Sequence, residues 1–285
     1  MQELRGLPAV NALTEGFKAD IDKMKQMGIV PKLTIVRVGQ REDDLAYERG
    51  ILKRFSAVGA ATEVIELPLD CSQERLEQII NTQNKDTDVH GILLFRPLPG
   101  HLCEDSIKLL VSKEKDVDCM GIGNMMDVFS GNKNCYPPCT PQAVVELLDY
   151  YKIDVTGKKV TIIGRSMVVG KPLSMLLLHR NSTVTICHTK TQNLADECRK
   201  ADILIACAGA AGMVKESFVN SEQIVIDVGI NVVDGKLCGD VDYENVKDIV
   251  KAITPVPGGI GTLTTSVLLK HTIRSAINHS DISRI

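Results

Sequence analysis

The chain has 285 residues, of which 44% are hydrophobic and 24% charged, a composition typical of a soluble globular protein with about two domains. Its net charge of −3 gives no reason to expect a nucleic-acid or membrane partner, and no apolar run approaches the ~18 residues of a transmembrane span. Nine scattered cysteines without a C-x-x-C pair, and six dispersed histidines, argue against a disulfide framework or a metal centre and for reduced thiols in a cytoplasm.

The first part of the chain alternates helical and strand patterns. Its N-terminal residues lack the apolar stretch of a secretory signal, and apolar residues at helical spacing begin at residue 8. Helices are predicted over residues 8–27, 43–58 and 72–84, and strands over 33–38, 62–67 and 89–94. Ser72 is the expected N-cap of the third helix. The alternation predicts βαβ units in a mainly parallel sheet, whereas segment 115–141, with three prolines, is predicted to be a long irregular functional loop.

A second α/β pattern follows. It contains a helix over residues 141–151, strands over 160–163, 183–187, 203–206 and 223–228, and a last helix over 263–276. A glycine- and proline-rich loop at residues 254–262 precedes that helix. The fold class predicted is α/β, with two α/β lobes around a cleft where a cofactor and a substrate meet.

Residues 160–178 read as a buried strand, a tight turn at Gly164, and a helix that begins after Gly170 and Pro172. Such a turn binds phosphate, because glycine lets the backbone approach closely and the free N–H groups of the helix face the anion. Arg165 and Ser166 lie in the turn, where a cation and a hydroxyl suit the 2′-phosphate of NADP better than the ribose of NAD. The alternative is an ordinary tight connection without a ligand.

Several separate motifs together resemble the methylenetetrahydrofolate dehydrogenase/cyclohydrolase family. They are Lys115-Asp-Val-Asp118, Pro138-Cys-Thr-Pro141, Gly164-Arg-Ser-Met-Val-Val-Gly-Lys-Pro172, His188-Thr-Lys-Thr191, Asp227-Val-Gly229, Gly239-Asp-Val241 and Thr254-Pro-Val-Pro-Gly-Gly259. The resemblance covers roughly residues 9–276. It implies hydride transfer from methylene-tetrahydrofolate to a nicotinamide cofactor, followed by hydrolysis of the methenyl product. It also implies a folate-binding catalytic domain over residues 1–139 plus 264–285 and a Rossmann-like NAD(P)-binding domain over 140–263.

On the folate side, the resemblance assigns Tyr47 to a position against the ring system of the substrate. It assigns Asp118 to the pterin, because a carboxylate can accept hydrogen bonds from the N–H groups of that ring. A buried structural tyrosine and a loop-capping carboxylate are the alternatives. Pro255, Gly258 and Gly259 match a loop that borders both folate and nicotinamide, where glycine permits an approach that a side chain would block.

On the cofactor side, the resemblance assigns Arg165 and Ser166 to the adenosine phosphate, and Thr189 keeps a hydroxyl where the family often has serine. NADP is therefore preferred over NAD, and the alternative for Arg165 is a surface arginine without a ligand. The whole expected cofactor-binding set is Gly164, Arg165, Ser166, Gly170, Thr189 and Ile230.

Two departures from the family pattern concern the catalytic residues. In the family, a lysine four residues after the tyrosine is credited with the hydrolysis, and a glutamine partners this lysine. In the present chain the lysine position is Ile51 and the glutamine position is Phe95. Residues four apart share a helix face, so Ile51 stands where the amine should be, and neither Lys53 nor Arg54 replaces it. Outside this pair, Cys119 stands at a glycine position and Thr262 at a proline position of the family, and Ala210-Ala211 replaces a lysine–proline pair.

These residues predict an NADP-dependent methylenetetrahydrofolate dehydrogenase whose cyclohydrolase activity is weak or absent. Hydride transfer needs orientation and no side-chain base, whereas activation of water does need one. Two alternatives stay open: a working bifunctional enzyme in which another group, such as Lys113 or Lys115, transfers the proton, and a silent folate- or dinucleotide-binding subunit. The resemblance also implies a homodimer.

Overall fold

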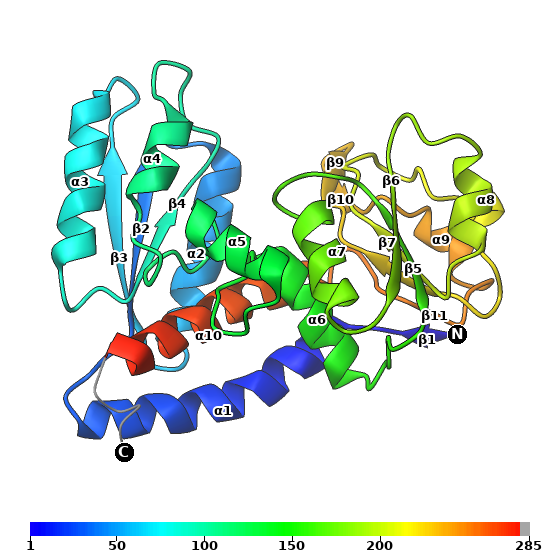
Figure 1. Cartoon of the computed structure of the whole chain (residues 1–285), viewed down its shortest axis with the longest axis horizontal. Coiled ribbons are helices and arrows are strands. Elements are labelled where there is room, and N and C mark those ends of the chain that lie inside the picture. Colours follow the sequence, from blue (N-terminus) through cyan, green and yellow to red (C-terminus); the bar gives the residue numbers. More distant parts are fainter. Residues whose placement is uncertain (280–285) are drawn as a thin grey trace. The chain divides into compact units, whose positions relative to one another are not determined.

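A computed structural model describes residues 1–279 and divides them into two compact units (Figure 1). The three-stranded unit contains residues 12–139 and the described residues from 265 onward, and the six-stranded unit contains residues 1–11 and 140–264. Residues 1–11 thus belong to the six-stranded unit, although the sequence prediction grouped them with residues 12–139. The reason is a two-residue strand, β1 (Gln2–Glu3), which pairs in parallel with β11 (Ala252–Ile253).

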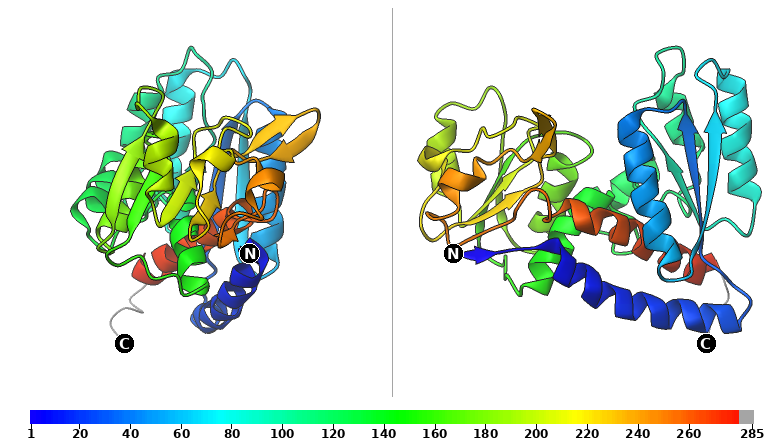
Figure 2. Two further views of the ribbon diagram at one scale, coloured as in Figure 1. Left: turned by 90° about the vertical axis from the view of Figure 1, so that its right-hand side faces the viewer. Right: turned by 180° about the vertical axis from the view of Figure 1, so that it is seen from behind.

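The three-stranded unit is built on a parallel sheet in the order β3-β2-β4. Its strands are β2 (Lys32–Val38), β3 (Ala61–Leu67) and β4 (Gly91–Leu94), and its crossover helices are α2 (Glu42–Ser56) and α3 (Gln73–Lys85). β3 pairs with one edge of β2, and β4 pairs with its other edge, so the two crossovers run in opposite directions along the sheet. Because both crossovers are right-handed, α2 and α3 lie on opposite faces of the sheet (Figure 2). Ser72 caps α3 as predicted, because its side chain accepts a hydrogen bond from the N–H of Arg75.

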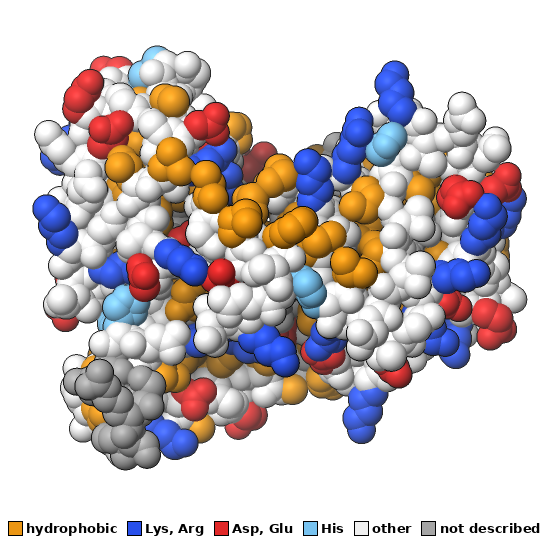
Figure 3. Space-filling view, viewed as in Figure 1, with side chains coloured by type: hydrophobic (Ala, Val, Ile, Leu, Met, Phe, Trp, Pro, Cys, Tyr) orange, Lys and Arg blue, Asp and Glu red, His pale blue; other side chains and the backbone are white. Residues whose placement is uncertain are grey.

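The prediction of an irregular loop over residues 115–141 is wrong in its central part. Helix α5 (Ile122–Ser130) occupies this segment, and α6 (Cys139–Tyr150) already begins within it. Gly121 and Gly123 weaken the helical pattern in the sequence, while Gly131 ends α5 in a left-handed conformation with φ 77°. The segment after β4 also holds α4 (Glu104–Leu110), which the sequence analysis did not predict. Exposed apolar side chains are visible over α5 in Figure 3, and they include Ile122, Met126 and Phe129.

The six-stranded unit is a parallel sheet in the order β1-β11-β8-β7-β5-β6. Its longer strands are β5 (Lys159–Ile163), β6 (Thr183–Cys187), β7 (Ile203–Ala206) and β8 (Ile224–Asp227), and α7 (Gly170–Leu178) and α8 (Leu194–Arg199) connect β5 to β6 and β6 to β7. All four strands lie at the predicted positions. Two α/β units, the second with a Rossmann-like parallel sheet, therefore confirm the predicted fold class.

Several smaller elements complete the described chain. A hairpin of β9 (Asn231–Val233) and β10 (Lys236–Cys238), a 3₁₀ turn (Glu216–Phe218) and a short helix α9 (Tyr243–Val246) belong to the six-stranded unit. The helices α1 (Gly6–Gln26) and α10 (Gly261–His279) each contain a boundary between the units. Within residues 1–279, no helix combines the length and the apolar character needed to cross a membrane.

The buried side chain of His271, on α10, makes stability depend on pH. Burial lowers its pKa to about 3, while its Nδ1 lies 2.8 Å from the carbonyl oxygen of Val117. The unfolded chain takes up a proton near the ordinary histidine pKa of about 6.5, whereas the folded chain does not, so His271 contributes stability above that pH and loses it as the pH falls. His90, with a pKa of about 4, acts in the same direction, and Asp227, with a pKa raised to about 6, acts against both.

Replacing His271 by asparagine should therefore flatten the acid side of the stability profile. The amide keeps an N–H donor for Val117 but cannot take up a proton. Between pH 4 and 6, the slope of the unfolding free energy against pH should fall by up to about 1.4 kcal/mol per pH unit relative to the unmodified chain. Urea titrations at several pH values measure this slope, and parallel profiles for the two proteins would contradict the assignment.

Candidate functional site

Tyr47, Ile51 and Phe95 form an apolar cluster in the three-stranded unit. Tyr47 and Ile51 lie one turn apart on α2, and Phe95 follows the last residue of β4. Ile51 is fully buried, Phe95 is 6% exposed, and the rings of Tyr47 and Phe95 lie 5.8 Å apart at an angle of 33°. The position of the family lysine is therefore taken by a fully buried isoleucine one helical turn from Tyr47, whose ring packs near that of Phe95.

Asp118 lies beside this cluster. Its Oδ1 accepts a hydrogen bond of 2.9 Å from the backbone N–H of Cys139. Burial raises the pKa of the Asp118 carboxyl, against the opposing effects of that hydrogen bond and of the Arg96 guanidinium. Burial also raises the pKa of the Tyr47 hydroxyl well above its usual value, and the nearby Asp118 adds to this effect. A half-buried carboxylate next to an aromatic ring suits the amino and ring N–H groups of a pterin.

In the segment Lys115-Asp-Val-Asp118, two residues stabilise the loop and one is available to bind a ligand. The Nζ of Lys115 donates to the carbonyl oxygens of Gln83, Asn84 and Asp86 at 3.0, 2.9 and 2.5 Å. Asp116 is 1% exposed, and its carboxylate accepts the N–H groups of Met120 and Gly121 at 2.7 and 2.9 Å. Lys115 and Asp116 therefore have a structural role, whereas Asp118 belongs to the candidate site.

The two lysines named as alternative proton-transfer groups are engaged elsewhere. All three ammonium protons of Lys115 have a carbonyl acceptor in the hydrogen bonds just described. Lys113 forms an ion pair with Asp127 at 2.6 Å, and this carboxylate raises the pKa of the lysine. Burial lowers the pKa of Lys115, but its Nζ is turned toward those three carbonyl oxygens. In this arrangement neither lysine is positioned to take a proton from water.

In the six-stranded unit, the phosphate-binding turn has the geometry that its glycines suggested. Gly164 adopts φ 133°, and a Cβ there would meet Cys207, whose Sγ would lie only 2.8 Å away. A Cβ on Gly170 would overlap the carbonyl group of Gly164. Both glycines are therefore required by the chain's own packing, because a side chain at either position would overlap the turn itself or the loop after β7.

This turn lies at the switch point of the sheet. β5 stands between β6 and β7, so the chain leaves β5 in one direction and returns on its other side. In open α/β sheets the ligand binds in the crevice outside the carboxyl ends of two such strands. Arg165 and Ser166 follow β5, and Thr189 follows β6, all three exposed at this end of the sheet. The structure thus gathers five of the six predicted cofactor residues there: Gly164, Arg165, Ser166, Gly170 and Thr189.

Replacing Gly170 by alanine should weaken dinucleotide binding. The added Cβ would overlap the carbonyl of Gly164, which is backbone and cannot move away alone, so the turn must open. We expect the dissociation constant for NADP to rise about tenfold or more, because losing one hydrogen bond between the turn and the cofactor costs about 1.4 kcal/mol. Calorimetric titration measures it. Alanine at Gly16, which has open space on helix α1, is the control and should leave NADP binding unchanged.

The remaining predicted residues line a pocket in the six-stranded unit. Ile230, Pro255, Gly258 and Gly259 border a volume of about 220 Å³ at the carboxyl ends of β8 and β11. Thr262, which stands at the family's proline position, donates a hydrogen bond of 2.7 Å to the carbonyl oxygen of Gly259 and so ties the end of this loop. The sequence assigned Ile230 to the cofactor and the other three to the substrate, and the structure places all four in one pocket.

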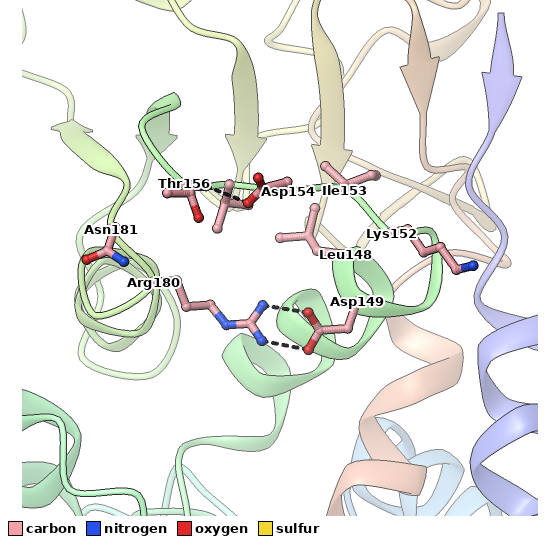
Figure 4. A pocket seen from close by; sticks show the side chains of 9 residues that line it. Leu148, Asp149, Lys152, Ile153, Asp154, Thr156, Arg180 and Asn181 are labelled. Atoms are coloured by element: carbon pink, nitrogen blue, oxygen red, sulfur yellow. Dashed lines mark hydrogen bonds and ion pairs between the residues drawn. The ribbon is translucent and has the colours of Figure 1, made fainter.

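A more polar pocket lies at the opposite end of the same sheet (Figure 4). Its residues precede β5 and β6, and it has a volume of about 460 Å³. The guanidinium of Arg180 and the carboxylate of Asp149 form two hydrogen bonds of 2.6 and 2.7 Å with each other. Because both charges are already satisfied and the pocket is at the amino ends of the strands, it is not the candidate cofactor site.

The sequence analysis missed two residues near Asp118. Cys139 supplies the N–H that orients the carboxylate, and Arg96, at the end of β4, contributes the positive charge that opposes the rise in its pKa. The motif around Cys139 was noticed without a role. A signal for Arg96 was present in the sequence, because it directly follows Phe95, one of the two departures from the family pattern.

Comparisons with known proteins agree with this geometry. The family model described as tetrahydrofolate dehydrogenase/cyclohydrolase, catalytic domain, matches residues 4–118, and the corresponding NAD(P)-binding domain matches residues 138–280. A protein of Clostridioides difficile (strain 630) named Bifunctional protein FolD is 53% identical over 275 residues, 96% of either chain.

Solved structures show the same likeness. The bifunctional enzyme FolD from Campylobacter jejuni has a TM-score of 0.96 and 38% identity, over 98% of this chain and 100% of that one. The Trypanosoma brucei N5,N10-methylenetetrahydrofolate dehydrogenase-cyclohydrolase, solved with NADP cofactor and an inhibitor, has a TM-score of 0.91 and 31% identity over 96% of both chains. The resemblance inferred from the motifs is confirmed. The chain belongs to the tetrahydrofolate dehydrogenase/cyclohydrolase family.

Proposed function

We propose that this chain is an NADP-dependent methylenetetrahydrofolate dehydrogenase in which cyclohydrolase activity is weak or absent. The observation that carries the second half of the proposal is the cluster of Tyr47, Ile51 and Phe95. Ile51 is fully buried and Phe95 nearly so, and their side chains hold no group that can accept a proton.

Dehydrogenation is compatible with an apolar cluster. The lone pair of a folate ring nitrogen expels the hydride from the methylene carbon, so the protein has only to orient the substrate and exclude water. In this proposal Asp118 accepts the pterin N–H groups, and the ring of Tyr47 lies against the folate. The turn from Gly164 to Gly170 follows β5 at the switch point, where a doubly wound sheet binds a dinucleotide, and the exposed Arg165 and Ser166 would hold its 2′-phosphate. NADP, when bound, accepts the hydride.

Hydrolysis of the methenyl product makes a different demand. A water molecule must lose a proton as it attacks, and a positioned base typically contributes 10²–10⁴-fold to such a step. Ile51 and Phe95 replace the family lysine and glutamine, and Lys113 and Lys115 have the ion pair and hydrogen bonds described above. These contacts support the proposal that the chain lacks an effective base.

The second candidate is a bifunctional enzyme. The name and high identity of the relatives favour it, since the Clostridioides difficile protein is called bifunctional. It requires either a proton-transfer group other than Lys113 and Lys115, or a conformational change that releases one of these lysines from its present ion pair or hydrogen bonds. Alanine at each lysine and a pH–rate profile of methenyl hydrolysis separate these versions.

The deciding experiment gives the purified chain methylene-tetrahydrofolate and NADP and follows NADPH and methenyl-tetrahydrofolate by absorbance together. We expect methenyl-tetrahydrofolate to accumulate in step with NADPH. If NADPH rises while methenyl-tetrahydrofolate disappears faster than in buffer, the bifunctional candidate is correct. Binding of both ligands without NADPH formation would reject both candidates and indicate a silent binding subunit.

We also propose, from the family resemblance, that the chain forms a homodimer and acts in the cytoplasm. Light scattering coupled to size-exclusion chromatography measures the mass in solution, and a monomer of 31.1 kDa at all concentrations would reject the dimer.

A further inference from the structure

Two buried carboxylates of the six-stranded unit have no part in the reaction proposed above. Asp227 ends β8 and is 3% exposed, and Asp240 lies after β10 and is fully buried. A carboxylate is costly to bury unless its oxygens accept hydrogen bonds, so each is expected to serve N–H groups of the surrounding backbone. Both belong to motifs that the family resemblance singled out without a role.

Asp240 holds the loop that follows β7. Its Oδ2 accepts the N–H groups of Ala208 and Gly209 at 2.6 and 2.9 Å. Its Oδ1 accepts the N–H of Ala210 at 2.8 Å and the side-chain amide of Asn231 at 3.0 Å. Three consecutive N–H groups converging on one anion form a concavity of the kind that often binds phosphate. Here the chain fills it with its own carboxylate, although residues 208–210 are themselves exposed.

Asp227 in turn holds Asp240. Its Oδ1 accepts the N–H groups of Gly229 and Asp240 at 3.0 Å each, and its Oδ2 accepts the N–H of Val241 at 2.9 Å. A Cβ on Gly239 would overlap the Asp227 carboxylate. The acids and glycines of the two motifs are therefore parts of one arrangement, which we call the carboxylate clamp (Asp227 and Asp240).

The loop held by the clamp borders the switch point. The N–H of Cys207 donates a hydrogen bond of 2.9 Å to the carbonyl oxygen of Ile163 at the end of β5, and the Cβ position of Gly164 points at Cys207. Residues 207–210 thus begin at the carboxyl ends of β5 and β7 and stand next to the phosphate-binding turn. The turn after β5 forms one wall of the crevice at the switch point, and the loop after β7 forms the opposite wall.

We infer that Asp240 is a positioning residue that fixes residues 208–210 as a wall of the NADP crevice, and so sets the affinity for the cofactor. The inference rests on the proposed dehydrogenase function. Replacing Asp240 by asparagine keeps the size of the side chain but turns an N–H₂ group toward backbone N–H donors, so one side of the loop must move away. Once NADP saturates the crevice, the loop is held again, and turnover is restored.

The test compares Asp240→Asn with Asp202→Asn in the full chain. Asp202 also accepts a backbone N–H, from Lys159 at 2.8 Å, but at the amino ends of β5 and β7, away from the crevice. In Asp240→Asn, KM and Kd for NADP should rise about tenfold to 100-fold, with kcat and the KM for methylene-tetrahydrofolate within about twofold. In Asp202→Asn the NADP constants should stay unchanged, even if the melting temperature falls.

Three outcomes overturn the inference. They are an unchanged KM and Kd for NADP in folded Asp240→Asn, a fall confined to kcat, and equal effects in both variants. If Asp240→Asn does not fold, Asn231→Ala removes only the fourth donor, and it should raise the KM for NADP about threefold, since one hydrogen bond is lost. An unmodified chain that forms no NADPH rejects the proposed function instead, and the calorimetric Kd still tests the clamp.

Hydrogen exchange adds a readout that does not need turnover. In the unmodified chain the amides of residues 208–210 should exchange slowly although their backbone is exposed, because each donates to Asp240. Rapid exchange of these amides in the unmodified chain would show that the clamp does not hold the loop.

Discussion

Methenyl hydrolysis should increase about 10²–10⁴-fold when Ile51 is replaced by lysine and Phe95 by glutamine in the same chain, which is the range of a positioned proton-transfer group. Ile51 is fully buried, so the new amine is poorly hydrated and its pKa falls toward neutrality. Glutamine at residue 95 adds an amide that can hydrogen-bond to the amine. The rate of methenyl decay above the rate in buffer measures the gain.

The matched control is Ile51→Met with Phe95→Gln, which keeps a long unbranched side chain at residue 51 without the amine. We expect no gain from it. A buried amine also costs stability, so the lysine variant should unfold at a lower urea concentration while its dehydrogenase activity persists. A folded, dehydrogenase-active lysine variant with unchanged hydrolysis would show that Ile51 and Phe95 are not the cause of the missing activity.

Asp118→Asn should lower kcat/KM for methylene-tetrahydrofolate by about 10²-fold or more, because two charge-assisted hydrogen bonds to the pterin, worth about 1.5–3 kcal/mol each, are lost. The asparagine oxygen can still accept the N–H of Cys139, so the loop should keep its conformation. Steady-state kinetics with each substrate varied in turn measures the effect, and the KM for NADP should stay the same.

A comparison with Asp116→Asn separates binding from folding. Asp116 is buried and accepts two backbone N–H groups, so its substitution should lower the melting temperature more than Asp118→Asn does. If Asp118→Asn instead unfolds the protein and leaves kcat/KM intact at low temperature, Asp118 is a loop-capping residue, the alternative that the sequence left open.

The sequence predicted the regular elements well where their apolar patterns were unbroken. Strands β2 and β5 contain the β-branched runs 34–36 and 160–163, and Ser72 marks the start of α3. It failed at α5, where glycines interrupt the helical pattern, and at β1 and β11, which have two residues each. Strands that short carry no periodicity of their own and form only because a neighbouring strand is there to pair with.

The candidate site was predictable as a set of residues but only in part as an arrangement. The spacing of Tyr47 and Ile51 put both on one helix face, and the family resemblance added Phe95, whose ring the structure places 5.8 Å from that of Tyr47. The family resemblance assigned Asp118 to the pterin, but the sequence analysis assigned no role to Asp116, which the structure shows accepting the backbone N–H groups of Met120 and Gly121. The sequence did not predict the carboxylate clamp, because Asp227 and Asp240 are distant in sequence and are linked through the backbone N–H of Asp240.

The pairing of β1 with β11 has a practical consequence for handling the protein. Gln2 and Glu3 cover β11, which is buried and would otherwise be the outermost strand of the six-stranded sheet. An uncovered strand offers unpaired N–H and C=O groups to any other chain. Proteolytic removal of the first five residues should therefore leave β11 as an unpaired edge strand and promote aggregation. An affinity tag is better attached through a linker that has no cleavage site inside this segment.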